Sequence, residues 1–266
     1  MRVARSAVCA AILVALWVPT AWADWHAIAV TSPAPATLSA ELSTPRGAGP
    51  FPAVILLHGC GGIGLNIKEW AVWLRHEGYA AFVLDSFGGH GLRRLCGGSS
   101  ALTGRMRAPD VFAAARYLKT LPQIDGTRMA AIGYSHGGWT VMWAVATQAQ
   151  YPDVDIRAFV MFYPPCRGWK TLPGTAPVLM LLGGKDDWTP AEPCEALARS
   201  ASRGGTSITA VLYPDAYHHF DGAEVRGRRI VSDARGGLGA TIEYNPKAHD
   251  DAEKQVRAFL AANLKP

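Results

Sequence analysis

The chain has 266 residues, of which 49% are hydrophobic, and its formal net charge is +5 at pH 7. This length and composition allow one large buried core, so a single folded domain is the simplest organisation. The Lys and Arg residues are not gathered into a basic stripe, which argues against a nucleic-acid partner.

The first 23 residues have the pattern of a secretory signal peptide. The basic start Met1-Arg2-Val3-Ala4-Arg5 precedes an apolar run over residues 7–18 and the small-x-small end Ala21-Trp22-Ala23. This run is shorter than the roughly 20 residues that cross a bilayer, so we expect a cleaved signal and no stable membrane insertion. The mature domain would cover residues 24–266 and would be exported, either to the periplasm or to the medium.

Short apolar runs alternate with stretches of helical spacing along the rest of the chain. The expected strands cover residues 37–42, 53–57, 80–84, 128–132, 158–163, 178–182 and 207–213. The expected helices lie around residues 70–74 and over residues 111–118, 139–146, 191–199 and 251–260. Strands that are apolar throughout are buried on both faces, so this alternation predicts a doubly wound α/β fold with a mostly parallel sheet. The segment 37–42 alternates in polarity, as an edge strand does.

The sequence Gly133-Tyr134-Ser135-His136-Gly137 has the form G-x-S-x-G and joins an expected strand to an expected helix. Glycines two residues before and two after the serine permit a tight turn, which pushes the serine side chain out at the sheet edge. Helix N–H groups that begin just after the serine point at any negative charge that develops there. A chain with 28 glycines can contain this pentapeptide by chance, so its context decides.

Three residue types suited to nucleophilic catalysis follow the ends of expected strands, where ligands bind in such folds. They are Ser135, the pair Asp186-Asp187 and the pair His218-His219. A serine hydroxyl needs an adjacent imidazole to take its proton, and a carboxylate holds that imidazole in the right tautomer. The chain order serine, acid, histidine is the order of an α/β-hydrolase.

An oxyanion hole is expected beside the serine. Its two donors would be the backbone N–H groups of His136 and of Cys60, which lies in the glycine-rich loop after residues 53–57. We expect the ring of His136 to take no part, and we expect His58 to shape the oxyanion loop through a hydrogen bond. Phe87 and Trp188 also follow strand ends and are candidates to line the substrate pocket.

Four segments of the chain resemble the dienelactone hydrolase-like branch of the α/β-hydrolases. They are Leu57-His58-Gly59-Cys60-Gly61-Gly62, Gly133 to Gly138, Gly183-Gly184-Lys185-Asp186 with Pro190, and Tyr213-Pro214 leading to His218 and Phe220. The resemblance runs from about residue 51 to the C-terminus and implies an enzyme that cleaves a small-molecule ester or lactone without a cofactor. In this family the acid stands four residues before a proline, which selects Asp186, and the base stands two before a phenylalanine, which selects His218.

Two departures from the family pattern bear on the substrate. The enzyme that gives the family its name has a cysteine nucleophile and a glutamate beside its oxyanion loop, where this chain has Ser135 and Gly59. The expectation is therefore a serine hydrolase for carboxylic esters or lactones that works through an acyl-enzyme, and not a dienelactone hydrolase in the strict sense.

Removal of the signal would leave Cys60, Cys96, Cys166 and Cys194. Four cysteines in an oxidising compartment allow three disulfide pairings. The expected strand order favours Cys60 with Cys96 and Cys166 with Cys194, because each pair joins segments that follow neighbouring strands. No Cys-x-x-Cys spacing is present, and we expect no metal site.

Other interpretations stay open at this stage. The segment from Gly59 to Gly64 spells G-x-G-x-x-G and Asp85 follows about 20 residues later, as in a dinucleotide-binding site. The same fold could also carry a peptidase, an acyltransferase or a non-catalytic binding protein. The segments 87–103 and 221–246 show no clear periodicity and could cover the active site. The sequence makes no prediction of the oligomeric state.

Overall fold

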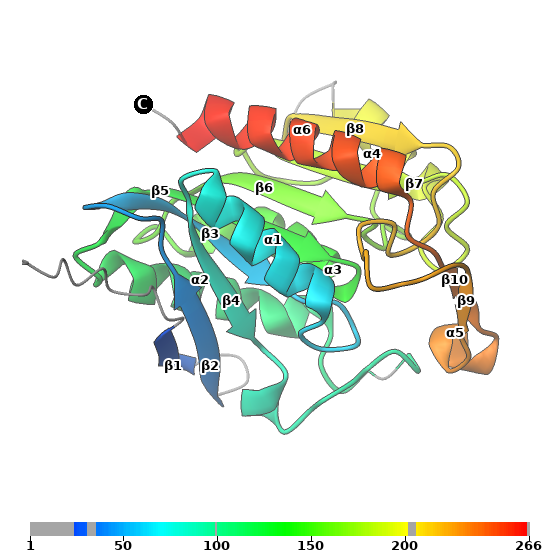
Figure 1. Ribbon diagram of the computed structural model, residues 1–266, viewed down its shortest axis with the longest axis horizontal. Helices are drawn as coiled ribbons and strands as arrows, with labels where there is room; N and C mark the ends of the chain where they lie inside the picture. Colours follow the sequence, from blue (N-terminus) through cyan, green and yellow to red (C-terminus); the bar gives the residue numbers. More distant parts are fainter. Residues whose placement is uncertain (1–23, 31–35, 99, 202–205, 265–266) are drawn as a thin grey trace, which may run out of the picture.

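The computed structural model describes residues 24–264 apart from 31–35, 99 and 202–205 (Figure 1). The predicted signal peptide, residues 1–23, lies outside the described residues. No helix within the described ranges has the length and the apolar character that crossing a membrane requires.

The described residues form one eight-stranded sheet with the order β1-β2-β4-β3-β5-β6-β7-β8. The strands are β1 (Asp24–Val30), β2 (Ala36–Ser43), β3 (Phe51–Leu57), β4 (Ala80–Asp85), β5 (Ile124–Tyr134), β6 (Ile156–Phe162), β7 (Val178–Gly183) and β8 (Ile208–Tyr213). All neighbours from β4 to β8 run parallel, and β1 and β2 are antiparallel additions at one edge. The predicted fold class, a doubly wound α/β fold with a mostly parallel sheet, is confirmed.

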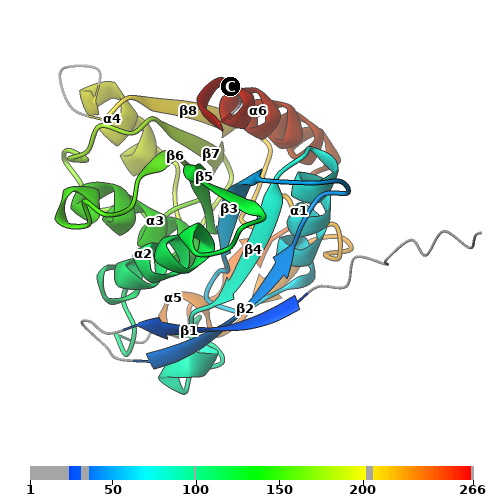
Figure 2. The same ribbon diagram turned by 90° about the vertical axis from the view of Figure 1, so that its left-hand side faces the viewer.

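Helices cover both faces of the sheet (Figures 1 and 2). They are α1 (Leu65–His76), α2 (Gly104–Lys119), α3 (His136–Thr147), α4 (Glu192–Ala201) and α6 (Pro246–Leu264), with short 3-10 turns at Gly88–His90 and Gln148–Gln150. Figure 2 shows α1 and α6 on one face and α2, α3 and α4 on the other. Each face has its own hydrophobic core.

The continuous apolar runs of the sequence reflect this double coverage. In β3, Ile55 packs into the core under α2 and α3, while Val54 and Leu56 pack into the core under α1 and α6. Successive side chains of a strand point to opposite faces, so a strand covered on both sides has no polar position.

The sequence prediction that residues 37–42 form an edge strand is wrong. The edge strand is β1, which pairs with β2 along its whole length, and β2 pairs with β4 on its other side. The alternation in β2 arises because Leu38, Ala40 and Leu42 are buried while the residues between them are partly or fully exposed. The alternation of polar and apolar residues in β2 therefore indicates that one face of the strand is exposed. It does not indicate that the strand lacks a neighbour.

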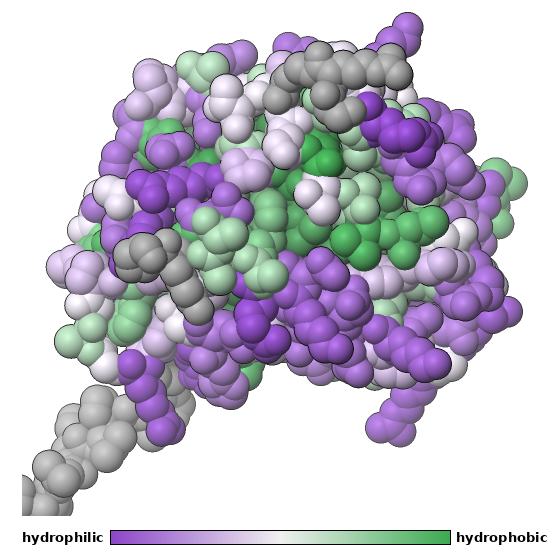
Figure 3. Space-filling model, turned by 90° about the horizontal axis from the view of Figure 1, so that it is seen from above, coloured by the Kyte–Doolittle hydropathy of each residue, from purple (hydrophilic) through white to green (hydrophobic). Residues whose placement is uncertain are grey.

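At the other end of the sheet, β8 has no further strand beside it within the described residues. Figure 3 looks down on the molecule from this side, where an apolar area lies between polar regions. Leu212 of β8 is 39% exposed.

Two excursions leave the sheet at the carboxyl ends of its strands. The first follows β4 and runs to the start of α2. The second follows β8 and contains the antiparallel pair β9 (Arg229–Val231) and β10 (Ala240–Ile242), with the short α5 (Ala234–Gly237) between them. Figure 1 shows β9, β10 and α5 projecting from the body of the molecule.

Candidate active site

Ser135 lies on the turn between β5 and α3, and its backbone has the positive φ of 54°. Such a conformation costs a non-glycine residue on the order of 1–3 kcal/mol, which the surrounding structure must supply. The two motif glycines explain how the turn closes. A Cβ on Gly133 would stand 2.2 Å from the Gly137 carbonyl oxygen, and one on Gly137 would stand 2.0 Å from the Leu57 carbonyl oxygen. Only glycine fits at either position.

Three side chains predicted from the sequence meet at the carboxyl edge of the sheet. The Nε2 atom of His218 lies 2.9 Å from Ser135 Oγ, and its Nδ1 atom lies 2.7 Å from Asp186 Oδ2. All three residues are buried, with exposed fractions of 9% for Ser135, 5% for Asp186 and 3% for His218. Asp186 comes from the turn after β7 and His218 from the loop after β8.

The carboxylate of Asp186 is held by a cluster of donors. Its Oδ1 accepts the N–H groups of Trp188 (2.9 Å) and Thr189 (2.8 Å), and its Oδ2 accepts the Thr189 hydroxyl at 2.8 Å. A carboxylate that accepts from Nδ1–H of His218 leaves Nε2 free of a proton, which is the tautomer that can accept from Ser135.

The ring of His218 is fixed by its neighbours as well. The Tyr163 ring centroid lies 4.4 Å from that of His218, and the Trp188 ring lies 4.8 Å from it. The hydroxyl of Tyr163 donates to the buried carboxylate of Asp221 at 2.6 Å. The imidazole therefore has little freedom to leave the line between the serine and the acid.

Asp187 and His219, the chain neighbours of Asp186 and His218, form hydrogen bonds with other partners. The carboxylate of Asp187 accepts the backbone N–H and the hydroxyl of Thr241, each at 2.8 Å. The ring of His219 lies 2.8 Å from Glu224. Burial lowers the pKa of His219, but the hydrogen bond to Glu224 and the charge of Asp221 raise it more, so that pKa ends above its ordinary value.

The glycine-rich loop after β3 runs beside the serine. A Cβ on Gly59 would stand 3.5 Å from the Cβ of Ser135. Neither the N–H of Cys60 nor that of His136 donates to another residue of the described chain. His58 is fully buried, and its Nδ1 lies 2.8 Å from the Gly59 carbonyl oxygen, as its predicted role in shaping the loop requires.

The ring of His136 faces away from the serine. Its Nε2 lies 3.0 Å from the Leu102 carbonyl oxygen and its Nδ1 lies 3.2 Å from an Arg107 nitrogen. Burial and the charge of Arg107 lower the pKa of His136 to about 3, so the ring is neutral. Near the serine, His136 therefore presents its backbone and not its ring.

A pocket of about 170 Å³ opens at Ser135 and His218. Its other lining residues are Gly59, Cys60, Gly61, Gly62, Gly64, Asn66, Arg94, Cys96, Tyr134, Tyr163, Trp188, His219, Val231 and Ile242. Trp188 lines the pocket, as the sequence predicts.

The prediction for Phe87 is wrong. Phe87 is 1% exposed, and its ring lies under the oxyanion loop against His58, with a centroid distance of 4.5 Å. The chain turns inward after β4 because the Asp85 carboxylate accepts the N–H groups of Phe87 and Gly88. The same contacts argue against a dinucleotide-binding site. The Asp85 carboxylate, which would bind the ribose in such a site, is engaged in this turn.

Both excursions without clear periodicity border the pocket. Arg94, from the first excursion, forms two hydrogen bonds of 3.0 and 2.6 Å with the carboxylate of Asp233 in the second. Val231 and Ile242, on the β9–β10 pair, add apolar surface. The segment 221–246 therefore carries residues of the site that the sequence pattern did not reveal.

The structure contains two disulfides, Cys60–Cys96 and Cys166–Cys194, which are the pairs favoured by the sequence. The first joins the oxyanion loop to the excursion after β4, where the Leu95 N–H also donates to the Cys60 carbonyl at 2.8 Å. The second joins the chain after β6 to α4.

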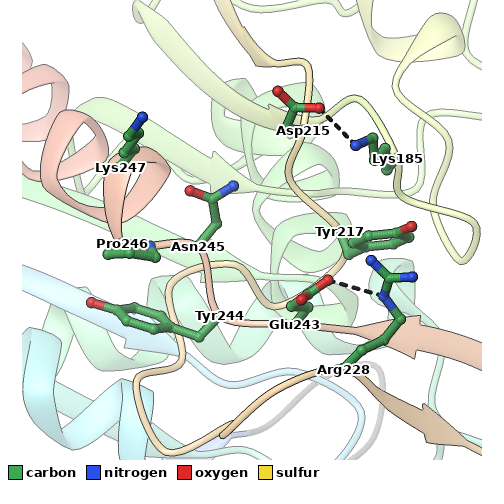
Figure 4. A pocket seen from close by; sticks show the side chains of 9 residues that line it. All are labelled: Lys185, Asp215, Tyr217, Arg228, Glu243, Tyr244, Asn245, Pro246 and Lys247. Carbon is green, nitrogen blue, oxygen red and sulfur yellow. Dashed lines mark hydrogen bonds and ion pairs between the residues drawn. The ribbon is translucent and has the colours of Figure 1, made fainter.

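A second hollow, of about 350 Å³, lies on the outer side of the loop that precedes His218 (Figure 4). Its lining residues are Lys185, Asp215, Tyr217, Arg228, Glu243, Tyr244, Asn245, Pro246 and Lys247. Figure 4 shows Lys185 paired with Asp215 and Arg228 paired with Glu243, at 2.6 and 3.1 Å. Ser135, Asp186 and His218 do not line this second hollow.

Fold and site together define the class of the protein. A mostly parallel sheet with a serine on a strained strand-to-helix turn, followed in the chain by an acid and then a histidine, is the arrangement of the α/β-hydrolases. The model of the dienelactone hydrolase family matches residues 38–264, and the chain belongs to this family. It is accordingly a hydrolase of the kind that acts on esters or lactones, and the sequence predictions of family and enzyme class are confirmed.

Individual relatives are distant. A Bradyrhizobium protein named "Probable 2-oxo-3-(5-oxofuran-2-ylidene)propanoate lactonase" is 25% identical over 193 residues, which are 68% of this chain and 78% of the relative. A promiscuous dienelactone hydrolase-like phosphotriesterase from metagenomic libraries has a TM-score of 0.66 at 21% identity, covering 90% of this chain and 98% of its own. The dienelactone hydrolase of Anabaena variabilis has a TM-score of 0.64 at 18% identity, covering 93% and 99%.

Proposed function

We propose that this protein is a serine hydrolase that cleaves carboxylic esters or lactones through a covalent acyl-enzyme. Ser135 is the nucleophile, His218 the general base and acid, and Asp186 the residue that fixes the histidine tautomer. The observation that carries the proposal is the pair of hydrogen bonds, 2.9 and 2.7 Å long, that His218 makes to the serine and to the acid.

The chemistry follows from this geometry. Ser135 Oγ attacks the substrate carbonyl carbon while His218 Nε2 takes the hydroxyl proton. The N–H groups of Cys60 and His136, which have no other partner among the described residues, bind the oxyanion that forms. The tetrahedral intermediate expels the alkoxide, which takes the proton from His218. A water molecule then attacks the acyl-enzyme by the same steps and releases the acid and the free serine.

The pocket favours small substrates. A volume of about 170 Å³ is below the usual range for drug-sized ligands, and Trp188, Val231 and Ile242 supply apolar walls. The lactonase name of the Bradyrhizobium relative supports including lactones. Ser135 and Gly59 stand where the enzyme that names the family has a cysteine and a glutamate, and this favours other small esters over dienelactone.

A fluorophosphonate probe tests the nucleophile directly. We expect the wild-type protein to be labelled at Ser135, because the probe phosphonylates only a serine that an adjacent base has activated. Peptide mapping by mass spectrometry locates the adduct. An unlabelled wild-type protein would favour a non-catalytic binding role, whereas labelling at another serine would move the reaction centre elsewhere.

We also propose that the protein is exported, to the periplasm or the medium, after cleavage before Asp24. The signal-like pattern of residues 1–23 and the two disulfides support this proposal. We expect the exported protein to begin at Asp24 and to weigh about 4 Da less than its fully reduced form, since each disulfide removes two hydrogens. Intact mass spectrometry before and after reduction measures both. A chain that retains Met1 and has all five of its cysteines as free thiols would contradict the proposal.

A further inference from the structure

Arg107 is a buried cation on the second turn of α2. Its exposed fraction is 0%, and one of its nitrogens, Nη1, donates to the His58 carbonyl oxygen at 2.9 Å and lies 3.2 Å from His136 Nδ1. The guanidinium carbon lies 4.9 Å from the centre of the Phe87 ring. Arg107 forms no ion pair within 4.0 Å with a described residue.

Stability alone does not account for an arginine at this position. Burial lowers the pKa of Arg107 to about 10, although the charges of Asp110 and Asp85 oppose the shift, so the side chain is still protonated at neutral pH. Its Nε and Nη2 atoms have no hydrogen-bond partner among the described residues. The cost of removing a charge from water offsets much of what its attractions contribute, so a buried cation is weak evidence for a stabilising role. The position therefore calls for another explanation.

The two groups that Arg107 contacts belong to the two backbone segments that flank the serine. His58 is followed by Gly59 and Cys60, and Cys60 provides one proposed oxyanion donor. His136 provides the other, and its ring is held between Arg107 and the Leu102 carbonyl. One guanidinium nitrogen thus bridges the two segments whose N–H groups must point at the same oxygen atom.

The oxyanion loop and the start of α3 are closely packed against each other. A Cβ on Gly137 would stand 2.8 Å from the His58 carbonyl oxygen, which is the atom that Arg107 binds. A small shift of His58 would therefore change the spacing between the oxyanion loop and the start of α3. Oxyanion donors are effective only when they are fixed at about 2.7–3.1 Å from the developing charge.

We propose that Arg107 is a positioning residue for the oxyanion hole, acting through the His58 carbonyl and the His136 ring. The inference rests on the proposed serine-hydrolase function. It predicts that Arg107 affects the stabilisation of the tetrahedral intermediate while substrate binding and folding depend on it little.

The test compares Arg107→Met and Arg107→Lys with the matched control Arg105→Met. Arg105 is an exposed arginine of the same helix, with its guanidinium over the Trp143 ring. We expect Arg107→Met to lower kcat for p-nitrophenyl acetate about 100-fold, near the effect of losing one oxyanion donor, with KM changed less than about threefold. Arg107→Lys should recover part of the loss, because an ammonium can still donate to the His58 carbonyl. Arg105→Met should keep the wild-type kcat.

Two further measurements separate positioning from a structural role. Affinity for a boronic acid, which forms a negatively charged tetrahedral adduct, should fall in proportion to kcat in Arg107→Met. Urea unfolding should show a single cooperative transition for Arg107→Met, so that its loss of kcat is measured on folded protein. A folded Arg107→Met with wild-type kcat and boronic-acid affinity would overturn the proposal, and so would the failure of both Arg107 variants to fold.

The same assay includes Ser135→Ala. If Ser135→Ala retains the wild-type rate, the proposed function itself fails. If Ser135→Ala is inactive while Arg107→Met is fully active, only the inference about Arg107 fails.

Discussion

Replacing Ser135 by alanine is expected to lower kcat for p-nitrophenyl acetate by about 10⁴-fold or more. The serine hydroxyl is 2.9 Å from His218, the proposed base, and the proposed acyl-enzyme cannot form without that hydroxyl. In enzymes of this mechanism, removal of the nucleophile alone costs nearly as much as removal of the whole triad. Any residual rate would come from substrate binding and the oxyanion donors.

Steady-state kinetics of the purified variant measure this effect, with Ser200→Ala as the matched control. Ser200 lies on α4, does not line the pocket, and donates its hydroxyl to backbone carbonyls. The control should keep the wild-type kcat. If Ser135→Ala and Ser200→Ala turn over substrate at similar rates, the nucleophile is another group.

The second large effect is expected at Asp186. Replacement by asparagine keeps the size of the side chain but removes the negative charge that holds Nδ1–H of His218. Asparagine can donate to Nδ1 and stabilise the tautomer that carries its proton on Nε2, where it can no longer accept from Ser135. We expect Asp186→Asn to lower kcat by about 10³- to 10⁴-fold with little change in KM.

The adjacent carboxylate supplies the control. Asp187→Asn should keep kcat within about threefold, because among the described residues the Asp187 carboxylate forms hydrogen bonds with Thr241 and not with His218. It should raise KM instead, since Thr241 precedes Ile242, which lines the pocket. A reversed order, with Asp187→Asn inactive and Asp186→Asn active, would make Asp187 the acid of the site.

Side-chain pattern predicts the parts of the fold that are covered on both faces. The strands β3, β4, β6 and β7 and the second half of β5 are apolar at nearly every position because both faces are packed, and this signal is strong even over six residues. The strands β9 and β10 have three residues each, which is too short for any alternation to show. The pairing of β1 with β2 depends on backbone hydrogen bonds that the sequence pattern does not encode.

The sequence pattern does not locate the start of α2, for a different reason. Its first turns bury Arg107 and Asp110, two residue types that pattern analysis treats as exposed. The expected helix therefore began at residue 111, whereas α2 begins at Gly104 with the hydroxyl of Thr103 accepting the Met106 N–H. The burial of Arg107 and Asp110 is therefore the reason why the pattern places the start of this helix too late.

The sequence pattern predicts the residue types of the site, but it identifies a single residue only for the serine. Ser135 is defined by the two glycines that its turn requires. Between Asp186 and Asp187, and between His218 and His219, the residues are chemically identical, so only the path of the turn or a resemblance to relatives can choose. The inward position of Phe87 also depends on the direction of a turn, which hydrophobicity does not encode.

The attachment of the β9–β10 pair has a consequence for how the specificity of this enzyme could diverge. The pair adds Val231 and Ile242 to the pocket, and β10 lies against the backbone of His218, where Ile242 forms a β-bridge and the Glu243 N–H donates to the His218 carbonyl oxygen at 3.3 Å. At its far end the pair is held by the ion pair between Arg94 and Asp233. Insertions, deletions or grafts in the turn that joins β9 to β10 would remodel one wall of the pocket at a distance from this β-bridge, whereas changes within β10 would also move His218. A loop on a rigid scaffold is where new substrate ranges arise, and here the turn at α5 is the part of the loop that can vary without moving His218.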